Sequence, residues 1–581
     1  MNMLTNLNRT QFLNDAGSFF QKEGKVKILN SYDLGKYMDS TIYGWEVELP
    51  SHLTVVLCLT EEFPSTSLPK VFLKGFKDLP SEYLHVEDNG RLCLNVKHEE
   101  LVLLSPLKII QMTFNSAREL VNNLEPIDVK SVGYQDEFIN YWFKQNARQG
   151  SYLVLSAPKV SPSCIYSINL DKQTIYSSAR EDCVDWANAF LGRNTQKLQL
   201  ADTQKTAVFV RLSELMMPVE FPKNGKELLS LAKKKGFESE LNSLIKSSED
   251  IVTVIFEYKN NGEVYYCSTS VRKKPLKKLN GFRKRNIPKH IAQAASFDNQ
   301  KTYVIDVTRV DSDWIHTRGG PEIGGVRNKH VTLVGCGSLG SQVALQLAQS
   351  GINLTLIDDD LLLSENTARH LLGGAEYVSM NKAFGLSMFL KKRFPHLSFK
   401  PLNRRVQDVI KDSKEIFHNS DLIVNTTGST SAEFQLAVFA RTDTRMPPMI
   451  FGWLEAHAIA GQLLIITDRG GCYFCEMSQR KCKVTKWGSS PQEKKEPACG
   501  AYYQPYGSVD MAPIQAMVSR ACLEVLNGVI KSSEVRTWIG DIALLNTLGG
   551  ELTEKWSTQK LEVGFREFKE KLRQNADCKF L

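Results

Sequence analysis

The amino-acid sequence predicts a multidomain α/β protein, and three observations support this prediction. The chain has 581 residues, which at about 150 residues per domain suggests roughly three or four domains. Its 42% apolar and 23% charged residues are ordinary for a globular protein and exclude a collagen-like or mostly disordered chain. From about residue 325 onward, strand-like and helix-like segments alternate, which is typical of a mostly parallel sheet covered by helices.

The first region, residues 1–145, is expected to be an α+β domain. Strand-like runs occupy 53–59 and 70–73. A helix should follow, because Ser105 can cap its start and Pro106 suits its first position. The apolar residues that then recur at helical spacing are Ile110, Phe114, Ala117 and Val121.

The middle region, residues 146–317, is expected to be a mixed α/β linker domain without a catalytic constellation. Its strand-like runs are 152–155, 207–210, 252–258, 264–267 and 303–307, separated by polar helices such as 226–235. It also carries nine Lys and Arg residues between positions 272 and 289. We interpret these as a solvated loop, with a docking patch for an acidic partner or nucleic acid as the alternative. The net charge of +8 is mild for this length, so nucleic acid is not an expected partner.

The third region, residues 318–581, carries a nucleotide-binding pattern. Gly335, Gly337 and Gly340 form G-x-G-x-x-G between an expected strand, 330–334, and an expected helix, 341–350. Such glycines permit a tight turn and close approach of a phosphate to the helix N-terminus. Asp358 follows Gly335 by 23 residues at the end of the next expected strand, where a carboxylate can hold a ribose hydroxyl. This pattern predicts a Rossmann-like domain.

Charged residues after this fingerprint favour chemistry at phosphorus over hydride transfer. Asp360 is followed by Asn366 and Arg369, and Lys382 lies 13 residues beyond Arg369. Attack on a phosphate builds negative charge on its oxygens, and clustered cations neutralise that charge. The alternative is that Arg369 and Lys382 are ordinary surface residues.

V-G-x-G-x-x-G, D-x-D, N-x-x-R and the later lysine together resemble the ThiF-like adenylating enzymes and the ubiquitin-activating enzymes, over about residues 318–545. The resemblance implies that the C-terminal carboxylate of a partner protein attacks the α-phosphate of ATP, giving an acyl-adenylate and pyrophosphate. It places Asp358 at the ribose and Asp360 at the family's second acidic position. By position, it assigns the phosphates to Asn366, Arg369 and Lys382.

One motif departs from this family. Where the family has D-x-T-D with a magnesium-binding aspartate, this sequence has Asn425-Thr426-Thr427-Gly428. We therefore expect Mg²⁺ to be held mainly by the ATP phosphates and by another carboxylate, with Asp360 as the candidate.

This region contains a cysteine pair that could bind a metal and a separate cysteine that could act as a nucleophile. Cys472 and Cys475 form C-x-x-C, which can supply half of a tetrahedral zinc site. No second C-x-x-C completes it, because Cys482 and Cys578 stand apart, so a buried or loop cysteine pair is the alternative. Cys499 lies in a charged, Gly- and Pro-rich segment, as an accessible nucleophile requires, and the order of motifs is that of ubiquitin-activating enzymes.

The first region contains a further candidate nucleophile, Cys93. The segment from His85 to Leu94 resembles the ubiquitin-conjugating domains, whose pattern is H-P-N followed by G-x-(I/L)-C-L. The resemblance implies that Cys93 takes an acyl group from Cys499 and passes it to an amine. The Pro-Asn after the histidine is missing, and Asn89, Asn95 or a backbone N–H is the expected substitute for that asparagine.

This combination resembles the fused activating and conjugating enzymes of bacterial anti-phage (CBASS) operons. That resemblance implies a homodimer, a cGAS-like nucleotidyltransferase activated at its C-terminus, and a target amine as acceptor. The alternatives are a sulfur-carrier activating enzyme, which has no use for Cys93, and a non-catalytic ubiquitin-like scaffold.

Composition indicates a reducing compartment. The chain has only 12 cysteines, no secretory signal pattern and no uncharged apolar run approaching the roughly 18 residues of a membrane span. We therefore expect a cytoplasmic protein without membrane segments.

Overall fold

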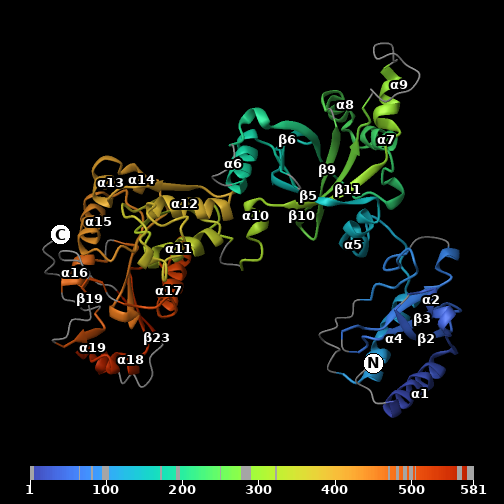
Figure 1. The fold of residues 1–581 in the computed structure, drawn as a ribbon, viewed down its shortest axis with the longest axis horizontal. Helices are drawn as coiled ribbons and strands as arrows, with labels where there is room; N and C mark the ends of the chain where they lie inside the picture. The colour runs from blue at the N-terminus through green and yellow to red at the C-terminus, as the bar shows by residue number, and fades with distance from the viewer. Residues whose placement is uncertain are drawn as a thin grey trace. The chain divides into compact units, whose positions relative to one another are not determined.

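The computed structural model is drawn as a ribbon in Figure 1. Its chain divides into two compact units. One comprises residues 1–148, 211–238 and 256–304, and the other comprises 149–210, 239–255 and 305–581. The structure describes residues 6–38, 40–64, 66–79, 83–94, 104–170, 173–191, 197–248, 250–275, 289–320, 324–468, 471–478, 483–488, 494–495, 502–503, 505–558 and 566–571.

The N-terminal part of the first unit is an antiparallel sheet packed on two helices. Helix α1 (Asn6–Glu23) precedes four strands in the order β1-β2-β3-β4. The strands are β1 (Lys25–Ile28), β2 (Thr41–Glu48), β3 (Thr54–Thr60) and β4 (Lys70–Lys74), with α2 (Ser31–Gly35) between the first two. Helix α4 (Pro106–Asn122) completes the layer, and this α+β arrangement agrees with the strands and the helix expected from the sequence.

The start of α4 is the one that the sequence predicts. Ser105 caps the helix by accepting a hydrogen bond from the Lys108 N–H, and Pro106 occupies its first turn. Its four predicted apolar residues are buried, and the ring of Phe114 meets Phe19 and Phe20 edge to face. Burying this stripe against the sheet forms the core of the region.

Helix α5 (Val132–Phe143) lies in the same unit and is anchored by two buried polar contacts. The Tyr134 hydroxyl donates to the Met216 carbonyl at 2.6 Å. The Trp142 Nε1–H donates to the Ser268 carbonyl at 2.8 Å. The helix is thus fixed at both ends, which matters because Glu137 and Asn140 lie on it.

The middle region forms a closed barrel of seven strands in the order β10-β11-β5-β7-β6-β8-β9. The strands are β5 (Ala147–Ser156), β6 (Ser163–Leu170), β7 (Gln173–Ser177), β8 (Gln204–Arg211), β9 (Ile251–Asn260), β10 (Glu263–Arg272) and β11 (Thr302–Arg309). The accompanying helices are α6 (Arg180–Leu191), α7 (Gly225–Lys235), α8 (Glu238–Ser247) and α9 (Lys289–Gln293). The five expected strands are present, whereas closure into a barrel was not predicted.

The third region contains an eight-stranded sheet in the order β14-β13-β12-β15-β16-β17-β21-β23. The first five strands are parallel, and the last three run antiparallel to their neighbours. They are β14 (Phe399–Leu402), β13 (Asn353–Ile357), β12 (His330–Val334), β15 (Leu422–Asn425), β16 (Met449–Leu454), β17 (Ala460–Ile466), β21 (Glu534–Ile539) and β23 (Arg566–Lys571). The predicted mostly parallel sheet is thus present, with an antiparallel extension.

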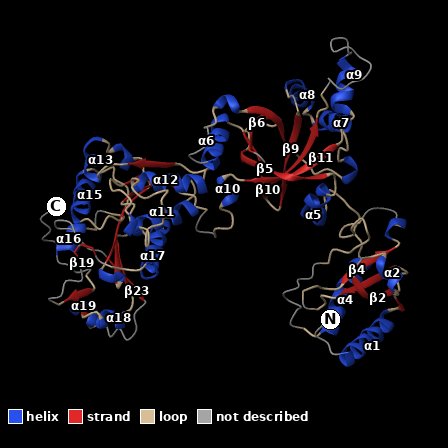
Figure 2. Ribbon diagram, viewed as in Figure 1, coloured by secondary structure: helices blue, strands red, loops and turns tan. Residues whose placement is uncertain are grey.

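Helices cover both faces of this sheet (Figure 2). One apolar core includes residues of α11 (Ser338–Gln349), α12 (Lys382–Arg393) and α17 (Ser508–Leu526). The other includes residues of α13 (Val406–Asp412), α15 (Thr430–Thr442) and α16 (Tyr473–Ser478). Strands buried on both faces read as continuous apolar runs, which is why the sequence indicated them clearly.

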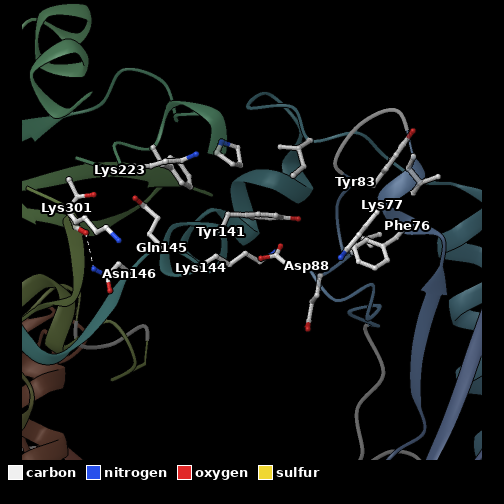
Figure 3. A pocket seen from close by; sticks show the side chains of 17 residues that line it. Phe76, Lys77, Tyr83, Asp88, Tyr141, Lys144, Gln145, Asn146, Lys223 and Lys301 are labelled. Atoms are coloured by element: carbon white, nitrogen blue, oxygen red, sulfur yellow. Dashed lines mark hydrogen bonds and ion pairs between the residues drawn. The ribbon is translucent and has the colours of Figure 1, made fainter. Parts of the chain in front are cut away.

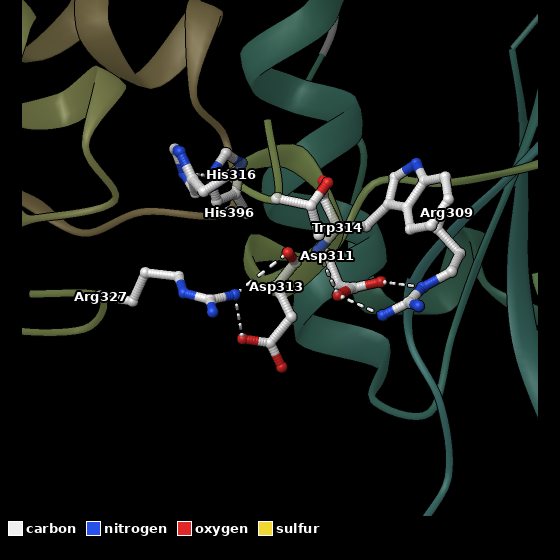
Figure 4. A network of polar contacts seen from close by, with 8 residues as sticks. Arg309, Asp311, Asp313, Trp314, His316, Arg327 and His396 are labelled. Atoms are coloured by element: carbon white, nitrogen blue, oxygen red, sulfur yellow. Dashed lines mark hydrogen bonds and ion pairs between the residues drawn. The ribbon is translucent and has the colours of Figure 1, made fainter. Parts of the chain in front are cut away.

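The short helix α10 (Ser312–Ile315) is held by a polar network (Figure 4). Arg309 binds Asp311 through two hydrogen bonds of 2.8 and 2.9 Å, and Asp311 caps the helix. His316 and His396 face each other with their Nε2 atoms 3.1 Å apart. Burial lowers the pKa of His396 to about 4 and also lowers the pKa of His316, so both rings are neutral at pH 7. One Nε2 therefore donates a hydrogen bond to the other.

Candidate functional site

The glycine loop connects β12 to α11. Gly335 has φ of 87°, in the left-handed region that favours glycine. A Cβ at Gly340 would lie 1.9 Å from the Gly335 carbonyl oxygen, so this position has no room for a side chain. A Cβ at Gly337 would meet nothing within 4 Å. The first and third glycines therefore form the turn, and the second leaves the backbone open to a ligand at the N-terminus of α11.

A cavity of about 390 Å³ lies beside this loop, at the carboxyl ends of β12 and β15. The strand order reverses there, which is the usual place for ligands in open α/β sheets. Gly337, Asn366, Arg369 and Lys382 all line this cavity, so the structure brings four predicted residues together. Gly337 and Lys382 lie 45 positions apart in the sequence, and the fold places both at one cavity.

Arg369 and Lys382 give the cavity its positive charge. The Nε of Arg369 is buried without a hydrogen-bond partner, and its guanidinium carbon lies 4.7 Å from the centre of the Tyr506 ring. Lys382 Nζ is 2.8 Å from Asp360, and the lysine side chain is only 13% exposed. A buried unpaired donor is costly, so an anion at Arg369 would be bound favourably. These residues fit a polyphosphate ligand such as ATP.

The two predicted aspartates hold the loop itself. The buried Asp358 carboxylate accepts from the Cys336 N–H at 2.6 Å and from the Asp360 N–H at 2.9 Å. Burial raises the pKa of Asp358, an effect that these two donors oppose. Among the described residues that line the cavity, neither Asp358 nor Asp360 appears. The ribose contact of Asp358 therefore stays a prediction.

Two positioning residues escaped the sequence analysis. His370 donates through Nε2 to the Cys336 carbonyl at 2.6 Å and accepts at Nδ1 from the Leu372 N–H, and burial lowers its pKa. Asn381 caps α12 and donates to the Asp358 carbonyl at 2.9 Å. An asparagine directly before an expected helix is a capping signal that could have identified Asn381, whereas His370 follows no pattern.

Two buried carboxyl groups also line the cavity. The Tyr473 hydroxyl donates to Glu433 at 2.8 Å, and burial raises the pKa of Glu433 to about 7. Glu455 accepts hydrogen bonds from the Gln462 amide, from the N–H groups of Val484 and Thr485, and from the Thr485 hydroxyl. One carboxyl group is thus partly protonated near neutral pH, and the other is held in place by four hydrogen-bond donors.

The positions of the missing acidic motif do not fit a magnesium ion. Asn425 is buried, its Oδ1 accepts from the Thr427 N–H at 3.2 Å, and its Nδ2 has no partner. Gly428 lines the cavity but offers only backbone. Within the described ranges, the one group of three or more His, Cys, Asp or Glu side chains close enough to share an ion is Asp358, Asp359 and Asp360. The magnesium assignment stays a prediction.

Cys472 and Cys475 are buried in the core beneath the sheet, beside Phe451 and Phe474. In the part of the chain that the structure describes, no further Cys, His, Asp or Glu joins them in a group that could hold a metal. Two thiols are half of a tetrahedral zinc site, so zinc stays a prediction. Cys482, Cys499 and Cys578 lie outside the described residues.

Cys93 is exposed and lines a second cavity, of about 350 Å³. Burial of the sulfur and the nearby carboxylates of Glu137 and Glu87 raise the pKa of the Cys93 thiol. Asn89 lines the cavity, but its Oδ1 accepts from the Arg91 N–H, and Asn95 lies outside the described residues. The other lining residues are His85, Val86, Asp88, Asn140, Tyr141 and Lys144. Sequence reasoning missed Glu137 and Asn140, because they lie on α5, more than 40 residues from Cys93.

A larger cavity, of about 1090 Å³, adjoins that of Cys93 in the same unit (Figure 3). The two share five lining residues, and in one shared contact Lys144 points to Asp88 at 3.1 Å. The other basic residues of this cavity are Lys77, Lys223 and Lys301. Cys93 is therefore next to a space large enough for part of a second molecule.

Among the described helices, none combines the length and apolar character needed to cross a lipid bilayer.

Residues 319–555 match the ThiF family. Two related proteins are described as ATP-dependent ubiquitin transferase-like protein Cap2. The one from Vibrio cholerae is 27% identical over 265 residues, which is 42% of this chain and 44% of that protein. The one from Pseudomonas aeruginosa is 29% identical over 181 residues, which is 30% of this chain and 32% of that protein. The alignments thus span less than half of either Cap2 protein. A crystal structure of Escherichia coli MccB with ATP shares 15% identity, covering 45% of this chain and 68% of MccB with a TM-score of 0.32.

Proposed function

Because residues 319–555 form a ThiF-family domain, we propose that this protein uses ATP to adenylate the C-terminus of a partner protein. The observation that carries the proposal is the cavity at the strand-order reversal, where Gly337, Arg369 and Lys382 converge. It offers an open backbone at a helix N-terminus and two cations, which is what a triphosphate requires.

The chemistry follows from where charge develops. A carboxylate of the partner attacks the α-phosphorus of ATP, a bond forms between them, and pyrophosphate leaves. Arg369 and Lys382 neutralise the charge that builds on the phosphate oxygens, and Asn366 contributes an amide to the same wall. Asp358 and His370 keep the loop in place through the Cys336 backbone.

Two thiols complete the proposed pathway. The Cys499 thiolate attacks the acyl-adenylate, releases AMP and holds the partner as a thioester. Cys93 then takes the acyl group by thioester exchange and passes it to an amine. The exposure of Cys93 beside two adjoining cavities supports this role.

The relatives described as ubiquitin transferase-like support a protein as the activated substrate. We extend the proposal to a cGAS-like nucleotidyltransferase as that protein, to action in anti-phage defence, and to a homodimer as the working form. Magnesium accompanies ATP, and zinc at Cys472 and Cys475 is part of the same proposal.

The test supplies ATP, magnesium and a candidate partner, and follows pyrophosphate release and reductant-sensitive adducts by mass spectrometry. Cys499→Ala should abolish every thioester. Cys93→Ala should keep the thioester on Cys499 but prevent amide product. A thioester that persists without Cys499 would refute the first assignment.

Pyrophosphate release that never depends on the C-terminus of the partner would refute the class of activity. Transfer of sulfur to the partner, with no amide product, would favour the sulfur-carrier alternative. Partner binding without ATP consumption would favour the scaffold alternative.

A further inference from the structure

His85 lies directly opposite Cys93 in a tight hairpin. Val86 and Leu92 pair as an antiparallel bridge, and the Cys93 N–H donates to the His85 carbonyl at 2.8 Å. His85 and Cys93 are therefore the next opposed pair. Glu137 contacts His85, and its charge also acts on the Cys93 thiol, so the imidazole and the thiol share one neighbour. Both side chains line the same cavity.

The tautomer of His85 is fixed by Glu137 on α5. His85 Nδ1 is 2.9 Å from Glu137 Oε1, and a carboxylate oxygen can only accept, so Nδ1 carries the proton. The lone pair of the neutral ring is then on Nε2. The His85 side chain is 36% exposed and that of Glu137 is 17% exposed, so the pair is sheltered but reachable from the cavity. Together they form a base held in one orientation by a carboxylate.

The surroundings of Cys93 create a need for such a base. The charged groups near it are Glu87, Asp88 and Arg91 in the hairpin and Glu137 and Lys144 at α5. Lys144 is paired with Asp88, and the charge of Arg91 opposes the two glutamates by lowering the pKa of the thiol. Because its pKa is raised, the Cys93 thiolate is a poor leaving group unless a proton reaches it as the C–S bond breaks. The attacking amine must lose a proton in the same step.

We propose that His85 accepts the proton of the attacking amine at the Cys93 thioester and delivers it to the departing sulfur, and that Glu137 positions the ring. The amine nitrogen bonds to the thioester carbonyl carbon, and one of its protons moves to Nε2. The C–S bond then breaks, and the proton moves from Nε2 to the Cys93 sulfur. The products are an amide and a neutral thiol, and the ring returns to its starting form. This role rests on the proposed function, because it requires an acyl group on Cys93.

The test loads Cys93 without ATP, so that it stays separate from the activation reaction. The full-length protein is incubated with a peptide that ends in a glycine thioester, and acylation of Cys93 is followed by mass spectrometry of the peptide containing it. Free lysine is then added, and the rate of discharge is measured. Absence of ATP-dependent loading would affect the adenylation proposal alone. Failure of wild-type Cys93 to accept the thioester would overturn the present one.

Three variants separate the contributions. His85→Gln should slow discharge by about 100-fold, the lower end of general base catalysis. Glu137→Gln should slow it by about 10-fold. Glu87→Gln is the matched control, because it removes a second carboxylate from the same cavity without touching His85, and it should discharge within about twofold of wild type.

A second readout distinguishes orientation from damage to the fold. Both Glu137→Gln and Glu87→Gln should speed alkylation of Cys93 by iodoacetamide at pH 7, because removal of either charge lowers the pKa of the thiol. Only Glu137→Gln should also slow discharge. Unfolding would also expose Cys93 to alkylation, so both variants must keep the wild-type Tm for this comparison to hold.

Chemical rescue gives the third readout. His85 has φ of 62°, which glycine adopts without strain, so His85→Gly keeps the hairpin and leaves space for imidazole. Added imidazole should restore part of the discharge rate. Discharge at the wild-type rate in His85→Gln, or equal losses in Glu137→Gln and Glu87→Gln, would overturn the proposal.

Discussion

Two substitutions in the glycine loop, Gly340→Ala and Gly337→Ala, should separate the role of the loop in folding stability from its role in ATP binding. The added Cβ at Gly340 would meet the Gly335 carbonyl oxygen at 1.9 Å and the Thr426 hydroxyl oxygen at 2.5 Å. Ordinary C···O contacts are about 3.3 Å or longer, so the backbone must move by more than about 1 Å. Overpacking of this kind costs about 1–3 kcal/mol. At about 2–4 °C per kcal/mol for a domain of this size, we expect Tm to fall by roughly 2–12 °C.

Gly337→Ala should behave differently. Its φ of −72° suits alanine and its Cβ would meet nothing, so the cost is only that of a weaker N-cap residue, about 1 kcal/mol, or about 2–4 °C in Tm. The methyl group would occupy the space proposed for the triphosphate, so ATP binding should be lost.

Thermal unfolding and ATP binding, measured by calorimetry on both variants, check this pair of expectations. Equal destabilisation by the two substitutions would contradict the steric argument. Full ATP binding by a folded Gly337→Ala protein would contradict the assignment of the loop as a phosphate site.

Three further predictions follow. The pKa of Glu433 is raised from 4.5 to about 7, so between these pH values the folded state keeps a proton that the unfolded state has lost. The free energy of unfolding should therefore fall by about 3 kcal/mol as the pH rises from 4.5 to 7. Glu433→Gln should remove this dependence on pH. Urea unfolding at pH 5 and pH 8 should then give a smaller difference in the free energy of unfolding for the variant than for the wild type. Lys382→Met should lower ATP–pyrophosphate exchange by about 100-fold with Tm almost unchanged, because its ion pair with Asp360 is largely exposed on the aspartate side. Phe114→Ala should destabilise the first unit by about 3–5 kcal/mol, seen as a lower unfolding midpoint by circular dichroism, and a smaller loss would mean that the core closes around the cavity left behind.

The sequence predicted those features that depend on neighbouring residues. The turn at Gly335, the cap at Ser105 and the buried apolar stripe of α4 each follow from spacing within a few residues. Such signals are local because helix caps and glycine turns satisfy backbone groups of the same segment. The structure agrees with the sequence at all three.

Long-range features could not be predicted in this way. Closure of the seven-stranded barrel depends on pairing between β10 and β11 and between β9 and β8, and no local pattern specifies which edges meet. Glu433 is an ordinary charged residue in the first turn of a helix until the fold buries it against Tyr473. Glu137 reaches His85 across 52 residues, a separation without sequence signature. Residues far apart in the sequence meet at a cavity because of how the strands and helices are connected, so only the three-dimensional structure shows that they meet.

The two candidate sites differ in the charged side chains that the fold gathers around them. The nucleotide cavity brings Arg369, whose buried Nε has no partner, and Lys382 beside the open backbone of Gly337, which favours a polyphosphate. Around Cys93, burial of the sulfur and the carboxylates of Glu137 and Glu87 raise the pKa of the thiol.

This difference has a consequence for the direction of acyl transfer. In thioester exchange the thiol of lower pKa leaves faster, so an acyl group held on Cys93 returns slowly to a cysteine of ordinary pKa. A thioester formed there is correspondingly slow to discharge without help. Because burial and the nearby carboxylates raise the pKa of the Cys93 thiol, proton transfer is the demanding part of its final step. Glu137, one of these carboxylates, also orients the only imidazole among the described residues that line the cavity.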